Sequence, residues 1–106
     1  MRRLVSALAV VAVLVPAAAF AEVDVEGIWK KKCAQCHGND GAAKTKMGEK
    51  YKVPDMTTAE WHAANSEAAI KDAIVNGGKT KMPAWKDKLS TEEIDALVKY
   101  VRAMKK

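Results

Sequence analysis

Both cysteines of this chain lie in one five-residue stretch, CAQCH at positions 33–37, with a histidine directly after the second thiol. Positions i, i+3 and i+4 share one face of a helix. Cys33, Cys36 and His37 are therefore predicted to face a single object. A disulfide inside this stretch would close only a very short loop, which restricts the unfolded chain little. The fold is thus constrained above all by what these three side chains bind together.

The first 21 residues are predicted to be a cleaved secretory signal peptide. Two arginines at positions 2–3 precede an uncharged apolar run over residues 4–15, and a small-x-small cleavage site ends at Ala21. The run is shorter than the roughly 20 residues that a membrane-spanning helix needs. We therefore expect a mature domain over residues 22–106 in the periplasm, without stable membrane insertion, rather than an uncleaved anchor.

The mature domain is small and weakly basic. Of the 18 lysines and arginines in the chain, 16 remain after cleavage against 13 acidic residues, which gives a net charge of +3. So small a domain seldom buries enough apolar surface to fold without a disulfide, a metal or a cofactor. The sequence has no basic helix with interleaved aromatic residues, and its charge is low, so no nucleic-acid partner is expected.

The periodicity of apolar residues predicts an all-α fold of three to five short helices. The clearest helix follows a capping box that Ser90 forms with Glu93, and another follows Ser66 and ends at Gly77-Gly78. Residues 38–56 show little periodicity and are predicted to be a long loop, which in so small a domain indicates that it wraps a bound group. The predicted helices cover residues 24–36, 67–76 and 91–104, with one or two helical turns over 58–64.

The spacing C-x-x-C-H is the attachment signature of c-type haem. The two thiols bond to the two vinyl carbons of the porphyrin, and the imidazole reaches the iron from one face. One covalently attached haem c is therefore predicted, held by Cys33 and Cys36 with His37 as proximal ligand. Three alternatives are weaker. A thioredoxin-like dithiol needs a βαβ frame, a zinc site would have to recruit His62 without a second C-x-x-C or H-x-x-x-H pair, and a structural disulfide would leave the histidine incidental.

These residues resemble the class I (monohaem) c-type cytochromes of bacteria over nearly all of the mature chain. Besides the attachment motif, the matching segments are MPAW at 82–85, which is similar to the family's distal-ligand segment, and LVKY at 97–100, which is similar to its C-terminal helix. Trp29 stands four residues before Cys33, where the family usually has an aromatic residue. The resemblance implies a small cytochrome c fold, with the helices around one haem.

Two positions depart from the pattern of that family. The family often places a glycine four residues before the aromatic, where the first and last helices cross, but here that position is Val25 and the nearest glycine is Gly27. The crossing is therefore expected to be wider or shifted. The family also has a proline after the motif whose carbonyl accepts a hydrogen bond from the proximal histidine. Pro54 stands late in the loop, so no partner is assigned to His37.

Four methionines of the mature chain compete for the sixth position of the iron: Met47, Met56, Met82 and Met104. Met82 is favoured because Gly77-Gly78 bends the chain before it and Pro83 restrains the chain after it. The family resemblance indicates the same residue. Met56 is expected to fill the core instead, since methionine packs well into irregular gaps.

Four further residues are assigned lesser roles. Trp61 and Trp85 are expected to be core aromatics, and either could also pack on the porphyrin. The hydroxyl of Tyr51 is a candidate to donate a hydrogen bond to a haem propionate. His62 is the rival iron ligand. It has no glycine or proline beside it to direct it, so we expect it at the surface.

Two protein ligands would leave the iron without an open position for a substrate. The chain is therefore expected to be a soluble, monomeric carrier of single electrons between redox proteins and not an enzyme. If the bond from Met82 is absent or labile, the alternative is an open-iron haem protein that binds small gases or reduces peroxide. Seven lysines are either a solvated surface or a basic rim at the haem that attracts acidic partners: Lys30, Lys31, Lys32, Lys79, Lys81, Lys86 and Lys88.

Overall fold

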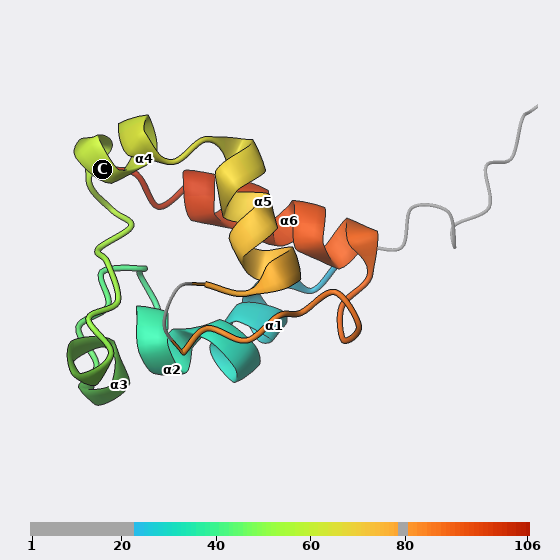
Figure 1. Ribbon diagram of the computed structural model, residues 1–106, viewed down its shortest axis with the longest axis horizontal. Coiled ribbons are helices and arrows are strands. Elements are labelled where there is room, and N and C mark those ends of the chain that lie inside the picture. The colour runs from blue at the N-terminus through green and yellow to red at the C-terminus, as the bar shows by residue number, and fades with distance from the viewer. Residues whose placement is uncertain (1–22, 79–80) are drawn as a thin grey trace, which may run out of the picture.

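The computed structural model describes residues 23–78 and 81–106, so the predicted signal peptide lies outside the described residues. Within these ranges the chain is helical and contains no strand, which confirms the predicted all-α class (Figure 1). The first helix is continuous over three labelled parts. The elements are α1 (Val25–Ile28), the π-helical turn η2 (Trp29–Cys33), α2 (Ala34–His37), α3 (Lys46–Lys50), α4 (Ala59–Ala64), α5 (Glu67–Asn76) and α6 (Thr91–Arg102).

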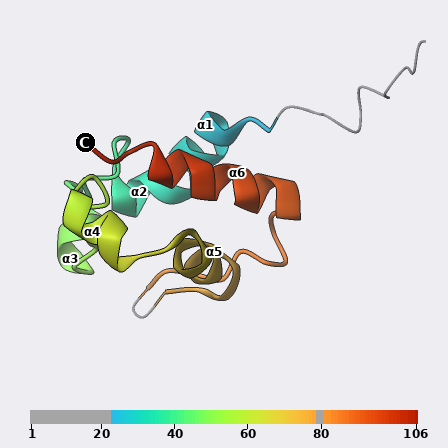
Figure 2. The ribbon, with the colours of Figure 1, turned by 90° about the horizontal axis from the view of Figure 1, so that it is seen from above.

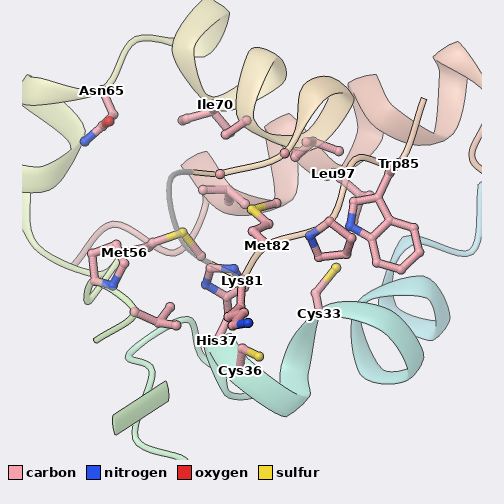
Figure 3. Close-up of a pocket in the computed structure, with 18 of the residues that line it drawn as sticks. Cys33, Cys36, His37, Met56, Asn65, Ile70, Lys81, Met82, Trp85 and Leu97 are labelled. Atoms are coloured by element: carbon pink, nitrogen blue, oxygen red, sulfur yellow. The ribbon is translucent and has the colours of Figure 1, made fainter. Parts of the chain in front are cut away.

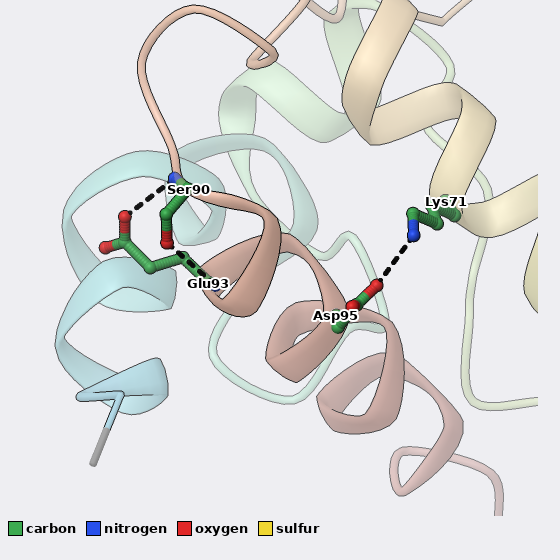
Figure 4. Close-up of polar contacts among 4 residues, drawn as sticks. All are labelled: Lys71, Ser90, Glu93 and Asp95. Atoms are coloured by element: carbon green, nitrogen blue, oxygen red, sulfur yellow. Dashed lines mark hydrogen bonds and ion pairs between the residues drawn. The ribbon is translucent and has the colours of Figure 1, made fainter. Parts of the chain in front are cut away.

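The predicted starts of α5 and α6 are confirmed. The hydroxyl of Ser66 accepts from the Ala69 N–H at 3.1 Å and begins α5. Ser90 and Glu93 form the capping box, with the Glu93 N–H donating to Ser90 Oγ at 3.1 Å and the Ser90 N–H donating to Glu93 Oε1 at 2.9 Å (Figure 4). Side-chain caps of this kind satisfy N–H groups that have no partner inside the helix. Helix α6 ends at Arg102, two residues before the predicted end.

The first helix contains a π-helical turn that the sequence did not predict. The Ala34 N–H donates to the Trp29 carbonyl, five residues earlier, rather than to the residue four earlier. Such turns insert one extra residue into a helix and are frequent at functional sites. Here Trp29 begins the turn and Cys33 ends it. The ring centroids of Trp29 and Tyr100, which lies on α6, are 5.4 Å apart.

Helix α6 packs against both α1 and α5 and forms the centre of the apolar core (Figure 2). Leu97, on its inner face, is 1% exposed. Lys71 and Asp95 add an ion pair of 2.9 Å between α5 and α6, but both side chains are about half exposed, so its contribution to stability is small. No helix in the described ranges has the length and apolar character to cross a membrane. The core residues are Trp29, Met56, Ile70, Ile74, Leu89, Ile94, Leu97, Val98 and Val101.

The predicted loop 38–56 contains a short helix, α3, that periodicity did not reveal. Thr45 begins it, with its hydroxyl accepting from the Gly48 N–H at 2.8 Å and donating to the Cys36 carbonyl at 3.0 Å. Gly48 is buried where this helix meets the end of α2. A Cβ at position 48 would lie 2.6 Å from the Cys36 carbonyl oxygen and would also collide with the Ala43 carbonyl. The close approach of backbone to backbone therefore requires glycine.

Substituting Gly48→Ala is expected to destabilise the folded chain by about 1–3 kcal/mol, because the new methyl group overpacks two carbonyl groups that cannot move independently. Alanine is otherwise the better helix former, so a loss of stability would isolate the steric effect. The exposed neighbour Glu49→Ala is the control. Urea unfolding of both variants checks the prediction, and a Gly48→Ala protein as stable as the parent would contradict it.

Candidate functional site

A cavity of about 680 Å³ lies between the first helix, the loop over residues 51–56, α5 and the segment that follows it. Its volume falls in the range of roughly 300–1,000 Å³ typical of small-molecule and cofactor sites. Figure 3 shows that its wall brings together residues from these separate elements. Four of its side chains carry sulfur and one carries an imidazole: Cys33, Cys36, Met56, Met82 and His37.

The three residues of the attachment motif line this cavity together, as their spacing predicted. Cys33 ends the π-helical turn, and Cys36 and His37 lie on α2. Both cysteines are free thiols, so the alternative of a disulfide within the motif does not describe this structure. Burial raises the pKa of the Cys33 thiol to about 11, with the nearby Lys32 opposing the shift. Before a haem is attached, that thiol is therefore neutral at physiological pH.

The imidazole of His37 is half-buried, and one of its nitrogens is unpaired in the described part of the chain. Burial lowers its pKa, so at neutral pH the ring keeps a nitrogen lone pair, which metal ligation requires. Its Nδ1 is buried without a hydrogen-bond partner among the described residues. Buried polar atoms are normally paired, and one that is not requires an explanation such as a bound group. An apolar cavity with two thiols and this imidazole on one wall fits a covalently attached haem.

Trp29 holds the end of α2 beneath this imidazole. Its indole N–H donates to the Gly38 carbonyl at 2.9 Å, a buried bond that ties the start of the first helix to the residue after the motif. The ring centroids of Trp29 and His37 are 5.7 Å apart. The aromatic residue four positions before Cys33 therefore holds the backbone directly after His37 as well as filling the core.

Met82 enters the cavity from a segment that is anchored to the end of α5. The Gly78 N–H donates to the Met82 carbonyl at 3.2 Å, and the Trp85 N–H donates to the Ile74 carbonyl at 2.9 Å. Gly77 has a φ of +91°, and a Cβ there would lie 2.9 Å from the Met82 carbonyl oxygen. Glycine at 77 thus allows both the turn and the close approach.

Met56 is the second methionine that lines the cavity, and it is 5% exposed within the core cluster, as expected of a core residue. Its backbone is held on both sides, with the N–H donating to the Gly41 carbonyl at 2.9 Å. Met47 and Met104 are not among the lining residues. Met104, which follows the end of α6, packs against the core cluster instead.

The prediction that His62 lies at the surface is wrong. The residue is 6% exposed, and its Nε2 donates to the Met56 carbonyl at 2.7 Å. The guanidinium of Arg102 donates to its Nδ1 at 3.0 Å and to its carbonyl at 3.1 Å. Since a carbonyl only accepts and a guanidinium only donates, these contacts satisfy both ring nitrogens. His62 is a structural residue that joins α4, α6 and the loop before α4.

The zinc alternative also fails on this geometry. His62 is not among the residues that line the cavity with Cys33, Cys36 and His37. In the part of the chain that the structure describes, no group of three or more histidine, cysteine or acidic side chains could hold a metal ion.

Three aromatic residues singled out in the sequence do line the cavity: Tyr51, Trp61 and Trp85. Trp85 is half-buried rather than a member of the buried core, and Figure 3 shows it among the residues that line the cavity. Other lining residues carried no signal in the sequence, because only tertiary packing brings them to one place. They include Val53 and Asn65.

The family described as "Cytochrome C oxidase, cbb3-type, subunit III" matches residues 21–101 of this chain. The chain belongs to this family. The cbb3-type cytochrome c oxidase subunit FixP of Bradyrhizobium diazoefficiens is 33% identical over 79 residues, which cover 74% of this chain and 26% of FixP. A cytochrome c6-like protein of Nostoc sp. is 36% identical over 86 residues, 81% of this chain and 73% of that protein. The solved c-type cytochrome KustC0563 gives a TM-score of 0.73 at 37% identity and covers 79% of this chain and 100% of its own.

These relatives confirm that the chain is a c-type cytochrome, of a family whose members act in electron transfer, with the fold expected of class I. The cofactor is accordingly a covalently bound haem c. The cytochrome spans about a quarter of the length of the cbb3-type subunits that it matches. It therefore corresponds to one part of those longer proteins, whereas KustC0563 is matched over its whole chain.

Proposed function

We propose that this cytochrome is a soluble carrier of single electrons, with its haem held by thioether bonds from Cys33 and Cys36, His37 as proximal ligand and Met82 as distal ligand. When bound, the haem supplies an iron that exchanges one electron between its ferrous and ferric forms. The observation that carries the proposal is the convergence of these four side chains on one cavity from two separate segments. Two protein ligands leave no iron position for a substrate, so the chain acts as a carrier and not as an enzyme.

The choice of Met82 over Met56 rests on how each residue is held. Met56 belongs to the buried core cluster, where its packing accounts for its position. Met82 lies on a short segment whose backbone is bonded to Gly78 and followed at once by Pro83. Such a restrained segment presents a weak thioether ligand without a large entropic cost. Methionine opposite histidine raises the reduction potential of a haem.

Export and partners complete the proposal. Residues 1–21 are the cleaved signal peptide and residues 22–106 the mature cytochrome, which works in the periplasm as a monomer. Its partners are redox proteins that bind at the lysine-rich edge of the haem. Relatives that are subunits of cbb3-type oxidases support a place beside larger respiratory proteins, as donor or acceptor of their electrons. Lys79, one of the predicted rim lysines, lies outside the described residues.

Visible spectra of the purified protein test this function. We expect spectra of haem c in both oxidation states, a band from the methionine–iron bond in the oxidised form, and haem that stays with the protein in acidified acetone. Carbon monoxide added to the reduced protein at neutral pH should cause no shift. A fast and complete shift would contradict the carrier and favour the alternative, an open-iron protein that binds gases or reduces peroxide.

A further inference from the structure

A row of aromatic rings connects the proximal histidine to α6. The ring centroids of His37 and Trp29 are 5.7 Å apart, and those of Trp29 and Tyr100 are 5.4 Å apart. Rings at such separations are in contact, since aromatic pairs pack with their centroids roughly 4.5–7 Å apart. Trp29 lines the cavity and Tyr100 lies on α6, so the row crosses the core from the cavity wall to the last helix. We call Trp29 and Tyr100 the aromatic row.

The two residues of the aromatic row differ in their access to water. Trp29 is 3% exposed, and its indole N–H donates at 2.9 Å to the Gly38 carbonyl, which accepts a hydrogen bond but does not remove a proton. An oxidised Trp29 therefore keeps its proton and carries a positive charge, which is unfavourable in an apolar core. Tyr100 is only partly buried, so water can take its phenolic proton when the ring loses an electron. The loss of an electron is thus passed from Trp29 to Tyr100.

Lysines make two of the other rings in the cavity wall harder to oxidise. The Nζ atoms of Lys32 and Lys88 lie 5.2 and 5.3 Å from the ring centroid of Trp85. The Nζ of Lys50 lies 5.5 Å from that of Tyr51. An ammonium over a ring is attracted to its π electrons and opposes the positive charge that remains when an electron leaves. In the described ranges, these contacts fall on Trp85 and Tyr51 and not on the aromatic row.

Trp61 is the remaining tryptophan of the cavity wall, and it has no second oxidisable ring beside it. Its aromatic contact is with His62, at 4.9 Å between ring centroids. Imidazole gives up an electron less readily than indole or phenol, so an oxidised Trp61 cannot pass the loss onward. Within the described part of the chain, the aromatic row alone joins the proximal ligand to a partly exposed tyrosine.

We propose that the aromatic row protects the cytochrome by carrying oxidising equivalents of hydrogen peroxide away from the haem, and that Tyr100 is the residue oxidised. Complete reduction of one peroxide breaks its O–O bond, forms two water molecules and consumes two electrons and two protons. Tyr100 supplies the electrons through Trp29 in two successive events. In each event its phenolic proton passes to the solvent and a neutral tyrosyl radical remains. A one-electron reductant such as ascorbate returns a hydrogen atom to that radical between the events.

This inference rests on the proposed function, in which His37 is the proximal ligand and Met82 the distal one. Peroxide reaches the iron only when Met82 has left it, so the reaction is infrequent and the aromatic row acts as a protection rather than as a catalytic route. It also leads away from the lysine-rich edge of the haem, because Tyr100 lies on α6.

A spin trap locates the oxidised residue. The ferric holoprotein is treated with hydrogen peroxide and a nitroso spin trap, and the adducts are assigned by mass spectrometry of its peptides. We expect the adduct on Tyr100 and its loss in Tyr100→Phe. The chain has two tyrosines, so Tyr51→Phe is the matched control and should leave the adduct at Tyr100 unchanged. An adduct found mainly on Tyr51, or on a tryptophan of the cavity wall, would overturn the proposal.

Trp29→Phe tests the path itself, because phenylalanine keeps a ring in the core but is much harder to oxidise. We expect most of the adduct at Tyr100 to be lost and peroxide to bleach the haem absorption faster, since the oxidising equivalents stay at the haem. Trp61→Phe makes the same change elsewhere in the cavity wall and should alter neither result. An adduct at Tyr100 that survives in Trp29→Phe would overturn the path.

Two measurements keep this test independent of folding and of the carrier function. The visible spectrum and reduction potential of each variant, recorded before peroxide is added, show whether the haem and its ligands are intact. Tyr100→Phe removes only a hydroxyl from a partly exposed residue, so it provides a second test if Trp29→Phe does not fold. We expect it to bleach faster than the parent and than Tyr51→Phe. Equal bleaching in all three proteins would contradict a protective role of Tyr100.

Discussion

Replacing Met82 by alanine is expected to lower the reduction potential of the haem by on the order of 0.2 V, a fraction of the ~0.8 V that axial ligands span. A thioether opposite histidine favours ferrous iron, whereas the water or hydroxide that would replace it favours ferric iron. The methionine–iron band of the oxidised protein should disappear. Carbon monoxide should then bind to the reduced variant, because the sixth position has become available.

Met56→Leu is the matched control for this experiment. Met56 lines the same cavity and is more deeply buried than Met82, so a general effect of losing a sulfur atom from the wall would appear in both variants. Leucine nearly conserves the volume of methionine and usually costs less than about 1.5 kcal/mol in a core. We expect its band and potential to stay close to those of the parent. A variant at Met82 with an unchanged band and potential would show that another residue is the distal ligand.

Helices with a local start signal were predictable from the sequence. Ser66 and Ser90 mark the starts of α5 and α6 because their side chains satisfy N–H groups of the first turn, which depends only on neighbours three residues away. Helix α3 has a cap of the same kind at Thr45, but its glycine and lysines show no apolar period. Its formation depends on packing against α2, and such tertiary contacts leave no periodic signal.

The residues of the candidate site also fall into those that the neighbouring sequence predicts and those that depend on distant partners. That the three residues of the attachment motif line one cavity was predictable, because they are neighbours on one helix face. The glycines and the proline that flank Met82 indicated that its segment is bent and restrained, and the structure places its side chain in the same cavity. The roles of His62 and Trp85 were not predictable, since each depends on a partner far along the chain. His62 meets Arg102, 40 residues later, and Trp85 meets Lys32 on the first helix. Long-range pairing of this kind can be found only once the fold brings the segments together.

A chain that has lost both thiols, Cys33→Ala with Cys36→Ala, is expected to fail to hold its haem and to unfold. The reason is the cavity of about 680 Å³, whose wall includes much of the small apolar core. Without haem, the apolar side chains that line this cavity face water, and the domain loses the burial that the cofactor provides. Small domains are stable by only about 5–15 kcal/mol. We expect the helical circular-dichroism signal to be largely lost.

The single variant Cys33→Ala serves as the control for that prediction. It keeps one thioether bond and both proposed iron ligands, so we expect a helical protein with a haem that resists acidified acetone, at lower yield. Adding free haem to the double variant should restore part of its helix content, because a ligand that binds only the folded chain stabilises it in proportion to the logarithm of its concentration. A double variant that is fully helical and unfolds cooperatively without haem would contradict the prediction. In that case the packing of α1, α5 and α6 alone would be sufficient to maintain the fold around the cavity.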